Sequence, residues 1–103
     1  MHADVFARRE GLIALCRRYD VARLEIFGSA ARGIDFDHGA SDIDFLVNFR
    51  PGGRMPALDQ FFGLAEDLET LLGRHVDLVE TGAISNPFLK AEIETARELV
   101  YAE

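Results

Sequence analysis

The 103-residue sequence predicts a small mixed α+β domain in which helices flank a mixed three-stranded sheet. Two long segments, residues 3–19 and 56–72, repeat apolar side chains every three or four positions, as amphipathic helices do. Short runs at residues 22–27, 42–49 and 75–79 have the composition of strands, and turn residues bound them. No linker or repeat interrupts this order, so residues 1–103 are expected to form one domain.

The first predicted helix and strand should each bury one face. On the helix this face carries apolar residues at helical spacing, namely Val5, Leu12, Cys16 and Tyr19, with Phe6 and Ile13 beside them. The strand alternates, so that Val21, Leu24 or Ile26 faces inward. Gly28 ends the strand.

Local signals bound two further helices. The helix over 56–72 is expected to stop at Gly73. Its predicted apolar stripe consists of Leu58, Phe61, Phe62, Ala65, Leu68 and Leu72. Asn86 and Pro87 suit the cap and first residue of a last helix. Its buried face is expected to be Leu89, Ile93, Ala96 and Val100.

Composition narrows the classes of function. Eighteen acidic residues against eleven basic ones give a net charge of -7, which argues against a nucleic-acid ligand. Small nucleotides remain compatible with this charge if metal ions supply local positive charge. Cys16 is the only cysteine, so no disulfide can form within the chain. With no apolar run of signal or membrane-spanning length, a soluble cytoplasmic protein is expected.

A candidate phosphate site follows the first strand. Gly28 allows a sharp turn and a close backbone approach to a ligand. Ser29 offers a hydroxyl, and the N–H groups after it begin a helical turn, where phosphates commonly bind. Arg32 can add a bidentate cation for phosphate oxygens.

A candidate metal site lies on the second strand. Asp42 and Asp44 point to the same face, roughly 6.6 Å apart along the strand. Ile43 and the other apolar residues of the strand take the opposite, buried face. Two carboxylates this close repel by roughly 2–3 kcal/mol at an effective dielectric near 20. Divalent cations remove that repulsion, and oxygen ligands suit magnesium or manganese.

Asp77 is the third candidate ligand. It lies on the third predicted strand between Val76 and Leu78, and should point away from both of them, towards Asp42 and Asp44. Three carboxylates from two strands can hold two metal ions roughly 3.5–4 Å apart.

These residues together resemble a known motif. The match is to the DNA polymerase β-like nucleotidyltransferase superfamily, whose motif this sequence resembles at Gly28-Ser29, then Arg32-Gly33, then the run from Ser41 to Val47. The resemblance covers nearly the whole chain. It is strongest to the minimal nucleotidyltransferases, the antitoxins of HEPN–MNT toxin–antitoxin pairs. Twelve residues separate Ser29 from Asp42, two more than is typical of that group. The extra length falls in the loop 34–40, so it is expected to alter the rim of the site rather than the metal ligands.

The resemblance implies both an activity and a partner. ATP would be the substrate, and AMP would be transferred to an acceptor hydroxyl, a tyrosine of a partner HEPN ribonuclease toxin. Two magnesium ions, or manganese in their place, would serve as cofactors. Asp42 and Asp44 would hold both ions and Asp77 one of them. A hetero-oligomer with the toxin would follow, and self-association stays open.

The same residues also allow other interpretations. A P-loop fails because Ile34 and Asp35 stand where lysine and serine or threonine are needed. A calcium loop fails because Ala40 replaces the required glycine. The carboxylates could form the exposed polar face of an edge strand, and Arg32 could be a surface charge. The functional alternative is a catalytically silent binding module that neutralises a toxin by masking its active site. A polymerase or tRNA-end-adding enzyme fails on size and negative charge.

Overall fold

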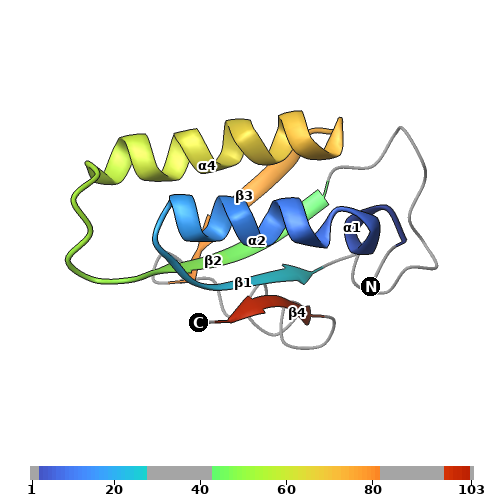
Figure 1. The fold of residues 1–103 in the computed structure, drawn as a ribbon, viewed down its shortest axis with the longest axis horizontal. Coiled ribbons are helices and arrows are strands. Elements are labelled where there is room, and N and C mark those ends of the chain that lie inside the picture. The colour runs from blue at the N-terminus through green and yellow to red at the C-terminus, as the bar shows by residue number, and fades with distance from the viewer. Residues whose placement is uncertain (1–2, 28–42, 82–96, 103) are drawn as a thin grey trace.

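The computed structural model describes residues 3–27, 43–81 and 97–102 (Figure 1). Helices and strands occur there in the order α1 Ala3–Ala7, α2 Arg9–Arg18, β1 Val21–Phe27, β2 Ile43–Phe49, α4 Ala57–Leu72, β3 Val76–Glu80 and β4 Arg97–Ala102. The expected mixed α+β class is therefore confirmed. The long N-terminal helix is divided at Arg8, whose backbone leaves the helical region at φ -104° and ψ 15°. None of the helices described is long and apolar enough to cross a bilayer.

The described strands form one mixed sheet in the order β3-β2-β1-β4. β1 pairs antiparallel with both β2 and β4, whereas β2 and β3 run parallel. The sheet thus has four strands, and the expected number of three is wrong. The additional strand is β4, which covers residues 97–102. The prediction that the last helix reaches Val100 is therefore also wrong, and residues 86–96 of that helix lie outside the described part of the chain.

Helices α2 and α4 pack side by side on one face of the sheet (Figure 1). The core lies between these helices and alternate strand residues. Its side chains, all 6% exposed or less, are Val5, Leu12, Cys16, Tyr19, Val21, Leu24, Ile26, Ile43, Phe45, Val47, Leu64, Leu68 and Val76. Alternation then sends Phe27, Asp44 and Asp77 to the opposite face. The fold therefore separates a packed face from a face that carries polar side chains.

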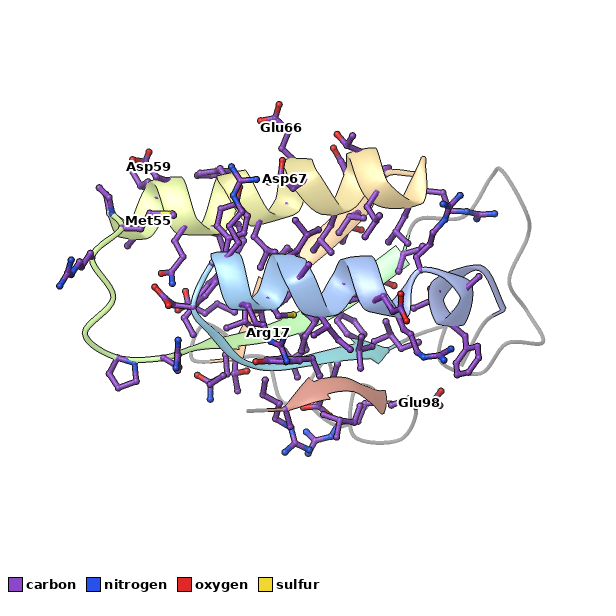
Figure 2. The ribbon with its side chains drawn as sticks, in the orientation of Figure 1. Arg17, Met55, Asp59, Glu66, Asp67 and Glu98 are labelled. Atoms are coloured by element: carbon purple, nitrogen blue, oxygen red, sulfur yellow. The ribbon has the colours of Figure 1, made fainter. Side chains whose placement is uncertain are left out.

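Polar contacts fix α4 against α2. The Tyr19 hydroxyl at the end of α2 donates to Asp67 Oδ2 at 2.5 Å, and the buried Gln60 amide donates to the Tyr19 carbonyl at 2.7 Å. Gly63 permits this approach, because a Cβ there would lie 2.9 Å from the Tyr19 ring. Asp59 and Glu66, on the same helix, project away from the sheet (Figure 2).

The predicted apolar stripe of α4 is confirmed for Leu68, which is fully buried, and for Leu72, which packs against the core, but it is wrong for Leu58 and Phe62. Residues 60, 64 and 68 are the buried ones, whereas Leu58 is 71% exposed and Phe62 62% exposed. Gln60 takes a core position because its amide satisfies a backbone carbonyl, which an apolar periodicity cannot anticipate. Phe6, expected beside the buried face of the first helix, is 53% exposed, and the Arg9 guanidinium lies over its ring, 4.3 Å from the centroid.

Gly73 ends α4 as expected. It adopts a left-handed conformation with φ 67°, and its N–H donates to the Glu69 carbonyl at 2.8 Å. The carboxylate of Glu69 also accepts from the Val76 N–H at 3.0 Å, so the end of the helix is tied to the first residue of β3.

Candidate active site

Four residues form a row across the face of the sheet opposite the helices. Asp77 of β3 lies beside Asp44 of β2, Asp44 pairs with Phe27 of β1, and Phe27 pairs with Arg97 of β4. Residues in register on neighbouring strands point to the same side of a sheet. The row therefore runs from two carboxylates, over a phenylalanine, to a guanidinium.

The two carboxylates lie at one edge of the sheet. β2 and β3 are parallel, and Asp44 and Asp77 are each the second residue of their strand. Neighbouring strands are roughly 4.8 Å apart, so the two backbone positions are close. Asp44 is half-buried, whereas the Asp77 side chain is 53% exposed. Both strands begin together because the Ile43 N–H donates to the His75 carbonyl at 3.1 Å.

His75 stands next to Asp77. Its Nδ1 is 3.8 Å from Asp77 Oδ1, and its Nε2 is 3.7 Å from Glu69 Oε2. The imidazole is 61% exposed. No motif spacing in the sequence predicted this position of His75 beside Asp77.

Of the six predicted site residues, the structure describes two, Asp44 and Asp77, and brings them together. Gly28, Ser29, Arg32 and Asp42 lie outside the described residues. Covalent connection still fixes where two of them attach, since Gly28 follows Phe27 and Asp42 precedes Ile43. Phe27 pairs with Asp44, so both attachment points lie at the same edge of the sheet as Asp77.

The donor set of this edge fits a hard divalent cation. Two carboxylates on adjacent parallel strands offer oxygen ligands, which magnesium and manganese prefer. Within residues 3–27, 43–81 and 97–102, no group of three or more His, Cys, Asp or Glu side chains could hold a metal ion. Asp42, the remaining predicted ligand, lies outside these ranges, and it would have to complete the set.

A small apolar cluster adjoins the row on the same face of the sheet. Phe27 and Leu46 are 8% and 3% exposed and pack together with Val79. Glu25, two residues before Phe27 on β1 and therefore on the same face, is a buried acid with a 7% exposed side chain. Its Oε1 lies 3.0 Å from Arg23 Nε and its Oε2 lies 3.1 Å from Arg97 Nε. Sequence reasoning missed this cluster, although an acid between Leu24 and Ile26 in a strand was an available signal.

A second surface feature lies on the other side of β3. An apolar groove between α4 and β3 is lined by Ala57, Leu58, Phe61, Phe62, Leu78, Val79 and Glu80. The rings of Phe61 and Phe62 meet edge to face with centroids 5.3 Å apart. The expectation that Phe62 belongs to the core is therefore wrong, since it forms part of this exposed surface.

The chain matches a known family and named relatives. The Nucleotidyltransferase domain family matches residues 9–100. A relative from Methanocaldococcus jannaschii, provisionally named protein adenylyltransferase MJ0128, is 44% identical over 87 residues, or 84% of this chain and 82% of that protein. Protein adenylyltransferase MntA from Thermococcus cleftensis is 38% identical over 87 residues, or 84% of this chain and 80% of that protein.

Solved structures share the fold. One described provisionally as a minimal nucleotidyltransferase superimposes with a TM-score of 0.74 at 34% identity, covering 95% of each chain. The MNT antitoxin complex with a tri-AMPylated HEPN toxin from Shewanella oneidensis gives a TM-score of 0.66 at 21% identity, covering 96% of this chain and 73% of that one. Since the family match spans most of the chain and the relatives exceed 30% identity, this chain belongs to the nucleotidyltransferase family.

Proposed function

We propose that this nucleotidyltransferase transfers AMP from ATP to a hydroxyl of a partner protein, a tyrosine of a HEPN ribonuclease toxin. It would thereby act as an antitoxin. The observation that carries the proposal is the pairing of Asp44 with Asp77 at the edge where Gly28 and Asp42 attach. The relatives named as protein adenylyltransferases and the antitoxin complex with an AMPylated toxin support it. Such a partner places the activity in the cytoplasm.

The residues divide into a phosphate side and an acceptor side. The triphosphate would bind to Gly28 and Ser29, with Arg32 contacting its oxygens. Asp42 and Asp44 would hold two magnesium ions, with Asp77 a ligand of one of them, and manganese suits the same oxygens. When bound, these ions supply charge neutralisation for the triphosphate, a lowered acceptor pKa and stabilisation of the leaving pyrophosphate.

The transfer is a single displacement at the α-phosphorus. The acceptor oxygen forms a bond to that phosphorus, and the bond to the bridging oxygen of the pyrophosphate breaks. Asp77 lies at the end of the row remote from Phe27, and therefore on the acceptor side. Its half-exposed carboxylate can take the proton that the hydroxyl loses. Products are the AMP-modified partner, pyrophosphate and the proton.

A second function is favoured by the groove between α4 and β3. Leu58 and Phe62 present large apolar side chains to solvent beside Glu80 and the outward-facing Asp59. Exposed apolar side chains bordered by charges are typical of protein-binding sites. A toxin surface with apolar residues ringed by basic ones would complement this groove. Binding alone, without catalysis, would then mask the toxin.

One experiment separates the two functions. The partner toxin is mixed with this protein, ATP and magnesium, and the mass of the toxin is measured. Catalysis requires a mass increase of one or more AMP units with release of pyrophosphate. Asp42→Asn and Asp44→Asn should each eliminate the increase, whereas Glu66→Gln, a comparable loss of charge on the outer face of α4 away from the groove, should not.

The outcomes differ in what they exclude. Toxin protected equally by wild type and by the double Asp42→Asn/Asp44→Asn protein, without a mass change, contradicts catalysis and leaves masking. Protection that needs ATP and survives removal of this protein is covalent. Protection that persists without ATP and ends when this protein is removed is stoichiometric binding.

A further inference from the structure

A buried carboxylate on the polar face of the sheet is neutralised by two arginines. Glu25 is 7% exposed at its side chain, which for an isolated charge would be costly. Arg23 and Arg97 each place Nε about one hydrogen-bond length from a different carboxylate oxygen, at 3.0 and 3.1 Å. Glu25 therefore fixes both guanidinium groups.

The two arginines stand at opposite ends of this cluster. Arg23 pairs with Asn48, near the end of β2, whereas Arg97 pairs with Phe27, beside Asp44. Only Arg97 is thus in the row that contains the carboxylates. It lies two strands from Asp44, and neighbouring strands are roughly 4.8 Å apart. The extended triphosphate of a nucleotide can cover a span of this size.

Arg97 is also accessible. Its side chain is 41% exposed although its Nε contacts a buried acid. The contact engages one donor of a guanidinium that carries five, in a rigid planar fork suited to phosphate oxygens. An arginine held by a buried carboxylate and open to solvent is ordered in advance, so it loses little conformational freedom when it binds an anion.

The geometry points to Arg97 as a binding residue for the terminal phosphates of the nucleotide, held in place by Glu25. This inference rests on the proposed function. Along the row from Asp77 to Arg97, the acceptor side comes first, the reacting phosphate lies at Asp44, and the leaving phosphates lie beyond it, past Phe27. The chain carries a net charge of -7, so a fixed cation at that end would offset repulsion of the polyphosphate.

Arg23→Gln and Arg97→Gln form a matched pair of variants. Each removes one Nε contact to Glu25 and leaves the buried carboxylate with one arginine. Binding of ATP, AMP and inorganic tripolyphosphate is measured by calorimetry with magnesium present. Arg97→Gln should weaken ATP and tripolyphosphate binding about tenfold while AMP binding changes less than about twofold. Arg23→Gln should leave all three affinities within about twofold of wild type.

Equal losses in the two variants, or no loss in Arg97→Gln, would overturn the inference. If Arg97→Gln does not fold, Arg97→Lys is compared with Arg23→Lys, since both keep the charge. A loss of tripolyphosphate affinity confined to position 97 is then required, because lysine cannot reproduce the planar fork. A wild-type protein that binds neither ATP nor tripolyphosphate with magnesium would overturn the proposed function itself.

Discussion

Replacing Asp44 by asparagine should have opposite effects in the absence and presence of magnesium and ATP. Asp44 and Asp77 lie in register on adjacent strands, so their charges repel when no cation is bound. Two charges roughly 5 Å apart repel by about 3 kcal/mol at an effective dielectric near 20. Because the Asp77 side chain is 53% exposed, solvent and salt reduce this to about 1 kcal/mol or less.

The stability of the free protein should therefore rise slightly or stay unchanged in Asp44→Asn. One kcal/mol corresponds to roughly 4–8 °C in the melting temperature of a domain of this size. The core should be unaffected, because Ile43 and Phe45 on either side point to the opposite, fully buried face. Wild-type protein with ligand at about one hundred times its Kd should gain about 2.7 kcal/mol, or roughly 10–20 °C.

The assay is thermal unfolding followed by circular dichroism, with and without magnesium and ATP. Asp44→Asn should lose the ligand-dependent rise in Tm. Asp59→Asn, on the outer face of α4, should keep it. A full ligand-dependent rise in Asp44→Asn would refute the assignment of Asp44 as a metal ligand.

Three further results are expected for stability. Burial raises the pKa of the Cys16 thiol from its ordinary 9.0 to about 12, so stability is intact below pH 9 and falls as the pH rises towards 12. Between pH 8 and 10, urea unfolding of wild type should therefore lose about 1.4 kcal/mol more than that of Cys16→Ala. Leu64→Ala should cost about 2–5 kcal/mol and Leu58→Ala less than about 0.5 kcal/mol, and similar losses would contradict the register of α4. Tyr19→Phe should cost about 1 kcal/mol by removing the hydrogen bond to Asp67, which also raises the pKa of Tyr19. A double-mutant cycle of Tyr19→Phe with Asp67→Asn should show coupling between the two positions, and no coupling would mean that the hydrogen bond is absent.

Strand residues of β2 were predictable because alternation decides which face each one takes. Ile43, Phe45 and Val47 are 0% exposed, as the pattern predicts, and Asp44 is directed to the other face. The closeness of Asp44 to Asp77 depends in addition on the parallel pairing of β2 with β3. A helix between two strands favours that arrangement, so the approach of the two carboxylates could be anticipated from element order. Their role as metal ligands stays a prediction.

The face of α4 could not be predicted from its apolar residues alone. The helix contacts both α2 and β3, and its sequence offers more large apolar side chains than those contacts can bury. Phe61 and Phe62 are adjacent and point about 100° apart, so they cannot face the core equally. The buried Gln60 decides the register, because its amide reaches the Tyr19 carbonyl across the helix interface. That partner lies 41 residues away in sequence and is visible only in the fold.

In the C-terminal strand, pairing with β1 overrides a local helical pattern, and this pairing positions a residue of the candidate site. Helical spacing from Leu89 to Val100 suggested a helix, yet residues 97–102 contain Leu99, Val100 and Tyr101, which also suit a strand. Pairing with β1 satisfies their backbone groups and completes the sheet. In a helix that continued through Arg97, no strand pairing would have fixed the position of this side chain. As part of β4, Arg97 instead lies in register with Phe27 and contacts Glu25, so the same pairing that overturned the helix prediction brings a cation into the row that contains the two carboxylates.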